Sequence, residues 1–129
     1  MKNIGLIGCG NIAETYFRAQ EYFNNINFVA CADINLDAAK KTAEQYNIIP
    51  LSVDEILTDK NVDIILNLTI PQAHYEISKR ALESNKHVYC EKPMSVKFDE
   101  AKELLNLAKK NSLYIGNAPD TFLGGGGQL

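Results

Sequence analysis

Residues 4–13 read IGLIGCGNIA, and this stretch decides the fold. A short apolar run, typical of a buried strand, ends at Gly8, and a helical pattern begins soon after Gly10. Gly8 permits a tight turn, Gly10 lets a ligand approach the backbone because it has no side chain, and Ala13 is small enough for close helix–strand packing. The N–H groups at the start of the helix favour a phosphate anion. The stretch therefore predicts a strand, a phosphate-binding turn and a helix, in that order.

The spacing G-x-G-x-x-A within this stretch is the fingerprint of dinucleotide-binding folds. A lone match is weak evidence, but here the match follows a strand and opens a helix, which is the context that the motif requires. We therefore expect the cofactor-binding turn to consist of Gly8, Cys9, Gly10, Asn11 and Ile12.

Short apolar runs alternate with helical patterns along the rest of the chain, which indicates a parallel sheet covered by helices. We expect strands at residues 2–8, 27–33, 63–68, 87–90 and 114–116, with a weaker one at 48–49. We expect helices over residues 11–23, after Asn35, from Ser52 (a capping-box pattern with Glu55), from Pro71 and over residues 99–110. The predicted fold class is α/β, a Rossmann-type doubly wound parallel sheet in three αβα layers.

Apolar periodicity also predicts which side chains the helices bury. The first helix is expected to bury Ile12, Tyr16, Ala19 and Phe23. In the helix from Pro71, four side chains are expected to point inward or toward the sheet edge: His74, Ile77, Ala81 and Leu82. The last helix is expected to bury Ala101, Leu104, Leu105 and Ala108.

The second expected strand ends at Asp33, 20 residues beyond Ala13. At this spacing a carboxylate reaches the hydroxyl groups of the adenosine ribose. The alternative interpretation is an aspartate that caps a helix or shapes a loop. A carboxylate here repels a 2′-phosphate, and residues 34–36 (INL) contain no Arg or Lys to bind one. The cofactor is therefore predicted to be NAD, with NADP the less favoured choice.

A third strand end carries further candidate residues, because ligands of an open parallel sheet bind outside the carboxyl ends of its strands. Residues 67–74 read NLTIPQAH. Thr69, Ile70 and Pro71 are expected to form the wall beside the cofactor, and His74 lies one turn into the following helix. The alternative for His74 is a side chain that caps or packs on the helix.

Residues 87–93 read HVYCEKP, and a Glu91–Lys92 pair at a buried strand end is hard to explain as solvated surface. An ammonium group here would polarise a carbonyl or stabilise an alkoxide beside the nicotinamide. Lysine suits this role because burial readily changes its protonation. Pro93 fixes the following turn and allows a cis bond before it. We expect Glu91, Lys92 and Pro93 to contact the cofactor, and Lys92 to be catalytic.

The composition is that of an ordinary soluble globular domain, since 46% of the 129 residues are hydrophobic, 22% are charged and the net charge is −3. No basic patch indicates a nucleic-acid partner. No apolar run approaches the roughly 20 residues of a membrane span, so a cytoplasmic location is expected. Cys9, Cys31 and Cys90 are not spaced like metal ligands, and we expect them to be small buried hydrophobes and no metal to be bound.

The fingerprint, Thr69-x-Pro71-x-x-His74 and residues 86–93 (KHVYCEKP) together resemble the Gfo/Idh/MocA family, that of glucose–fructose oxidoreductase and inositol dehydrogenase. The resemblance covers essentially the whole chain, and the Glu-Lys-Pro tripeptide is its most specific part. It implies a Rossmann domain followed by an open-faced α/β substrate domain, with Lys92 near nicotinamide and substrate. It also implies a sugar or polyol substrate and a homo-oligomer in the full-length form.

The resemblance also sets the expected domain limits. Residues 1–118 would form the NAD(P)-binding domain, and residues 119–129 would begin the connection to a substrate domain that is absent from this chain. Residues 118–124 (APDTFLG) differ from the Tyr/Arg-rich segment common in better-known members. In the family the second domain supplies an Asp and a His, or equivalents, for proton transfer. The chain alone is therefore expected to be inactive.

Three functions are compatible with these features. The favoured prediction is an oxidoreductase that transfers hydride between NAD(P) and a sugar, polyol or related carbonyl or alcohol. The second is a domain that holds NAD(P) without catalysis, as a sensor or scaffold. The third is a methyltransferase, which also places a Gly-rich loop and an acid on its first two strands, but residues 91–93 have no role in that chemistry.

Overall fold

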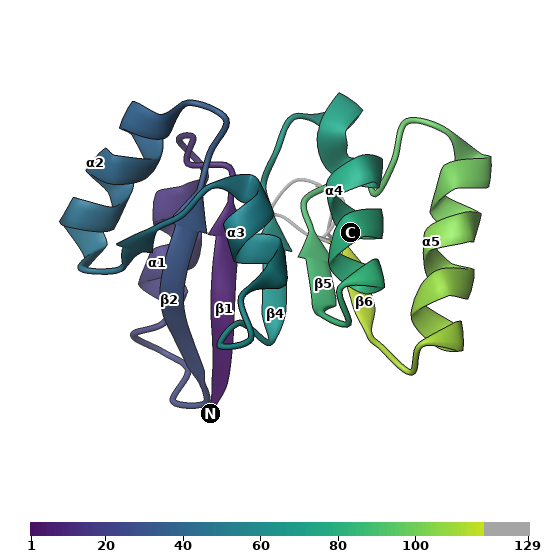
Figure 1. Cartoon of the computed structure of the whole chain (residues 1–129), viewed down its shortest axis with the longest axis horizontal. Coiled ribbons are helices and arrows are strands. Elements are labelled where there is room, and N and C mark those ends of the chain that lie inside the picture. Colours follow the sequence, from purple (N-terminus) through teal and green to yellow (C-terminus); the bar gives the residue numbers. More distant parts are fainter. Residues whose placement is uncertain (118–129) are drawn as a thin grey trace, which may run out of the picture.

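The computed structural model describes residues 1–117, which form a three-layer α/β fold around one parallel sheet (Figure 1). In this part of the chain six strands run in the order β3-β2-β1-β4-β5-β6. The strands are β1 Lys2–Ile7, β2 Ile26–Ala32, β3 Ile49–Pro50, β4 Ile64–Asn67, β5 His87–Cys90 and β6 Ile115–Asn117. The helices are α1 Ala13–Ala19, α2 Leu36–Tyr46, α3 Val53–Thr58, α4 Pro71–Glu83 and α5 Phe98–Lys110. This strand order confirms the predicted Rossmann-type sheet.

The core consists of two apolar clusters, one on each face of the sheet. On one face α1 and α2 contribute Ala13, Phe17 and Ala43. On the other face the buried side chains come from α3, α4 and α5. Because helices cover both faces, the inner strands are apolar along most of their length, as in residues 4–7 of β1, which are all buried.

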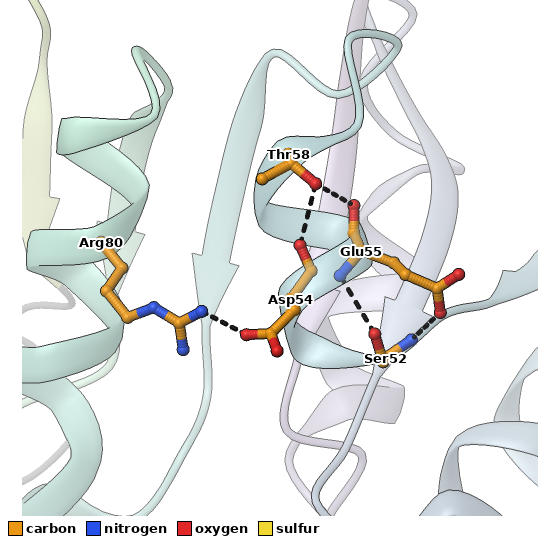
Figure 2. Close-up of polar contacts among 5 residues, drawn as sticks. All are labelled: Ser52, Asp54, Glu55, Thr58 and Arg80. Atoms are coloured by element: carbon orange, nitrogen blue, oxygen red, sulfur yellow. Dashed lines mark hydrogen bonds and ion pairs between the residues drawn. The ribbon is translucent and has the colours of Figure 1, made fainter.

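Local sequence signals fix where the helices begin. The capping box of α3 is confirmed: Ser52 Oγ accepts from the Glu55 N–H at 3.0 Å, and the Glu55 carboxylate accepts from the Ser52 N–H at 2.9 Å (Figure 2). The Asn35 side chain caps α2 by accepting from two N–H groups of its first turn. Pro71 occupies the start of α4, where its missing N–H leaves no helical bond unmade.

The prediction for the first helix is wrong in length and in buried face. The helix α1 spans only Ala13–Ala19, because the turn after β1 takes up the two residues before it. Its buried side chains are those of Ala13 and Phe17, whereas Ile12 is 45% exposed and Phe23 is 56% exposed. The helix therefore presents a face that is shifted by one residue from the predicted one.

The other elements lie close to their predicted positions, and every strand boundary falls within one residue of the expected one. As predicted, α4 buries His74, Ala81 and Leu82. In α5, Leu104 is buried as expected but Leu105 is 49% exposed, so that part of the prediction is wrong. The predicted connection at residues 119–129 lies outside the described residues. Of the helices described in residues 1–117, none is both long and apolar enough to cross a membrane.

The capping box gives a test of this local encoding. Ser52→Ala removes the side-chain acceptor of the Glu55 N–H and should lower the free energy of unfolding by about 1 kcal/mol. Glu55→Gln, which keeps an acceptor oxygen for the Ser52 N–H, should cost less. Urea denaturation of the three proteins measures both differences, and equal stability of Ser52→Ala and the unaltered chain would contradict the assignment.

Candidate functional site

The candidate site lies where the strand order reverses, between β1 and β4. Ligands of doubly wound sheets bind at this point because the loops after the two strands leave in opposite directions. Here the loops border a cleft of about 530 Å³. Five of the sequence-predicted residues line it, namely Gly8, Gly10, Asp33, Thr69 and Ile70.

The two glycines of the turn have different physical reasons to be glycine. Gly8 has φ of +105°, and a Cβ placed on it would lie 2.6 Å from the carbonyl carbon and oxygen of Leu68. A Cβ on Gly10 would meet no atom within 4 Å. Gly8 is therefore required by the fold itself, whereas the space above Gly10 is open to a ligand.

Asp33 holds the turn as well as facing the cleft. Its Oδ2 accepts from the Cys9 N–H at 2.7 Å, and its Oδ1 accepts from the Asn35 N–H at 2.8 Å. The carboxylate thus ties the loop after β2 to the glycine-rich turn after β1. The sequence spacing predicted a carboxylate at the cleft but not this bond to the turn.

Other predicted turn residues point away from this cleft. Cys9 and Asn11 line a separate hollow of about 420 Å³, between α1 and α2, that Gly10 also borders. A hydrogen bond with the Cys31 thiol lowers the pKa of the Cys9 thiol. Cys31 and Cys90 are buried, as expected of small hydrophobes, whereas Cys9 is only partly buried, so that expectation is wrong for Cys9. Ile12 is largely exposed and lines neither space.

The wall after β4 is organised by Asn67, a fully buried residue that was not among the predicted site residues. Asn67 Oδ1 accepts from the Thr69 hydroxyl at 2.6 Å and from the Thr69 N–H at 3.2 Å. Its Nδ2 donates to the His74 carbonyl at 3.0 Å and to Ser78 Oγ at 2.9 Å. Ile70, 67% exposed, projects at the cleft, and Pro71 begins α4.

The His74 ring lies inside the protein, with 1% of the residue exposed. Its Nε2 is 2.5 Å from the carbonyl oxygen of Thr69, and its Nδ1 is 2.5 Å from the carbonyl oxygen of Pro93. It therefore connects the loop after β4 with the loop after β5, and it does not line the cleft.

The loop after β5 begins with Glu91, which the structure joins to α1. The Glu91 carboxylate accepts a hydrogen bond from the Tyr16 hydroxyl, and the Glu91 N–H donates to the Asn67 carbonyl at 3.0 Å. Burial, together with the neighbouring Glu91 carboxylate, raises the pKa of Tyr16. The Lys92–Pro93 peptide bond is cis. Lys92 is exposed in the described part of the chain, so the expected burial of this lysine is wrong.

Sequence reasoning missed two residues of this site, Asn67 and Tyr16. Asn67 had a signal, since it is a polar residue at the end of the apolar strand Ile64–Asn67. Tyr16 had none, because only the tertiary fold brings α1 beside residue 91.

Comparison with known proteins places this geometry in a family. A family model described as "Oxidoreductase family, NAD-binding Rossmann fold" (GFO_IDH_MocA) matches residues 2–118. The chain belongs to the Gfo/Idh/MocA family. The resemblance drawn from the motifs is thus confirmed: the chain is a Rossmann domain of a family of NAD(P)-binding oxidoreductases.

Individual relatives agree with this assignment. The chain is 32% identical over 114 residues to glucose-6-phosphate 3-dehydrogenase of Bacillus subtilis. The aligned region covers 88% of this chain and 32% of that protein. It is 26% identical over 111 residues to inositol 2-dehydrogenase of Salmonella typhimurium, an alignment that covers 83% of this chain and 33% of that protein. A 3-ketoreductase from Actinomadura kijaniata, solved with NADP and TDP-benzene, superposes with a TM-score of 0.87 at 28% identity. The superposition covers 96% of this chain and 38% of that one. The chain spans about a third of the length of these curated Gfo/Idh/MocA relatives.

The two glycines provide a matched pair of variants. Gly8→Ala should lower the free energy of unfolding by about 2 kcal/mol or more, because the new Cβ combines a strained φ with a backbone clash. Gly10→Ala should change it by less than about 0.5 kcal/mol, because the added methyl group meets nothing. Urea denaturation compares them directly, and an equal loss of stability in both would show that the turn is built differently.

Proposed function

We propose that the cleft between the loops after β1, β2 and β4 holds NAD, and that the domain serves hydride transfer between this cofactor and a sugar, polyol or related carbonyl or alcohol. One observation carries the proposal: the open glycine-rich turn and the Asp33 carboxylate border the same cleft at the strand-order reversal. Titration of the chain with NAD in a calorimeter tests binding. Absence of heat at millimolar NAD would contradict the proposal.

The lining of the cleft suits the parts of a dinucleotide. The open space at Gly10 would take the pyrophosphate against the backbone of the turn. Asp33 would accept hydrogen bonds from the ribose hydroxyls. Ile34 and Ile70, 96% and 67% exposed, offer apolar surfaces on either side of the same cleft, and the flat adenine ring would remove them from water.

The charges around the cleft favour NAD over NADP. A 2′-phosphate would lie against the Asp33 carboxylate, and like charges in contact repel. Arg80 also lines the cleft, but its guanidinium is paired with the carboxylate of Asp54 on α3 (Figure 2). Binding of a phosphate by Arg80 would have to compete with this ion pair.

Cofactor choice is tested by removing the Asp33 charge while keeping its bond to the turn. Asp33→Asn retains an acceptor oxygen for the Cys9 N–H, and the excess of NAD affinity over NADP affinity should fall by about tenfold, the effect of one close charge pair near a protein surface. Glu44→Gln, on the exposed side of α2, makes the same charge change away from the cleft and should leave the ratio alone. Equal affinities for the two cofactors in the unaltered chain would refute the assignment.

We further propose that Lys92 is the catalytic residue of this domain. It follows β5 at the same carboxyl edge of the sheet as the cofactor cleft, on a loop joined to the cleft wall through His74. When bound, NAD supplies the hydride-accepting nicotinamide carbon. The Lys92 ammonium would stabilise negative charge on the oxygen of the reacting carbon, which is electrostatic catalysis by a fixed cation.

Substitution of Lys92 gives the corresponding test. In an enzyme that carries this chain together with a substrate domain, Lys92→Ala should lower kcat by roughly two to three orders of magnitude, the usual cost of one lost oxyanion-stabilising group. The dissociation constant of NAD should stay within about threefold. Lys97→Ala, an exposed lysine at the start of α5, serves as the control. Turnover within a few-fold of normal in Lys92→Ala would assign the role to another residue.

A further inference from the structure

The backbone around Lys92 is held on both sides by contacts from distant parts of the chain. Before it, the Glu91 N–H donates to the Asn67 carbonyl at 3.0 Å, and the Glu91 side chain accepts from the Tyr16 hydroxyl. After it, the Pro93 carbonyl oxygen lies 2.5 Å from His74 Nδ1. An exposed side chain on a loop is thus attached to a backbone that the protein interior fixes.

His74 is suited to hold this loop because it is itself held. Its backbone carbonyl accepts from Asn67 Nδ2, and its ring nitrogens face the Thr69 and Pro93 carbonyl oxygens. Only 1% of the residue is exposed. Buried polar networks of this kind define one arrangement, because each group left without its partner would be costly.

Two simpler roles for His74 do not account for this arrangement. A cofactor contact would need a ring atom at the cleft, but both nitrogens face backbone carbonyls and the residue does not line the cleft. A purely apolar packing role would need no nitrogen at all. Two contacts to two different loops, both at the carboxyl edge of the sheet, indicate a role in setting the distance between them.

We propose that His74 is a positioning residue: through the Pro93 carbonyl it fixes the place of Lys92 relative to the cofactor cleft, without touching cofactor or substrate. The inference rests on the catalytic role proposed for Lys92. The proposal also makes a structural claim, that the His74 ring fixes the loop after β5 through Nδ1, and this claim can be tested without any measurement of activity.

The two contacts of the ring can be separated by substitution. A carbonyl oxygen only accepts, so a ring nitrogen bonds to it only where that nitrogen carries a proton: a neutral imidazole donates in one of the two contacts, and the imidazolium form donates in both. The amide nitrogen of asparagine can take the place of Nδ1, and that of glutamine can take the place of Nε2. His74→Asn should therefore keep the Pro93 contact, and His74→Gln should keep the Thr69 contact. The two variants have the same polarity and differ by one methylene.

Hydrogen exchange of two backbone amides reports on the two loops in the chain itself. The Glu91 N–H is bonded to the Asn67 carbonyl, and the Thr69 N–H to the Asn67 side chain. In His74→Gln, exchange at Glu91 should accelerate roughly fivefold to tenfold, the effect of one lost hydrogen bond, while Thr69 stays within about twofold. His74→Asn should give the opposite pattern. Equal acceleration at both amides in both variants would overturn the proposal, because it would indicate general loosening.

A double-mutant cycle, in an enzyme that carries this chain together with a substrate domain, tests whether His74 acts through Lys92. His74→Gln should lower kcat by roughly tenfold with the NAD dissociation constant unchanged, and His74→Asn should restore most of the rate. In a Lys92→Ala background, His74→Gln should have no further effect on kcat. A full additional loss there would overturn the proposal. If Lys92→Ala alone leaves turnover unchanged, the proposed function of Lys92 fails, and the exchange pattern still decides whether His74 fixes the loop.

Discussion

The structure depends on one close approach, that of the backbone at Gly8 to the backbone that follows β4. No Cβ fits there, since it would lie 2.6 Å from the Leu68 carbonyl group. This contact brings the glycine-rich turn against the end of β4, at the point where the strand order reverses. The cleft exists because the two loops meet at their bases and then diverge. A larger residue at position 8 would separate β1 from β4 and remove the base of the cleft.

A second constraint is the polar residue Asn67 in an otherwise apolar sheet. Burying an amide is unfavourable unless its hydrogen-bonding groups are satisfied. Here its side chain bonds to Thr69, Ser78 and the His74 backbone, and its carbonyl accepts from Glu91. The cost of burial is thus offset by bonds that join the end of β4, the start of α4 and the end of β5. One residue fixes the arrangement of three segments around the candidate site.

The sequence was sufficient for the features that are encoded locally. The fingerprint, the strand runs and the Ser52 capping box each lie within a short segment, and the structure has all three. The buried face of α1 was predicted wrongly because this segment offers two apolar pairs at helical spacing, Ile12 with Tyr16 and Ala13 with Phe17, and periodicity alone does not choose between them. In the fold Ala13 and Phe17 are buried, whereas Tyr16 is only partly buried. The exposure of Lys92 was missed because it depends on how far the loop after β5 leaves the sheet.

The residues of the candidate site also fall into two groups, those that local sequence predicts and those that only the tertiary fold brings together. The groups that would bind the cofactor are the turn backbone and Asp33, whose spacing along the chain is enough to predict them. The residues on either side of Lys92 are held by groups from α1, β4 and α4: the Tyr16 hydroxyl and the Asn67 backbone carbonyl bond to Glu91, and the His74 ring faces the Pro93 carbonyl. No periodicity or spacing rule connects such positions. The proposed cofactor contacts therefore follow from spacing within residues 8–33, whereas the position of Lys92, the proposed catalytic group, is a property of the assembled fold. A substitution far from Lys92 in sequence would then move it.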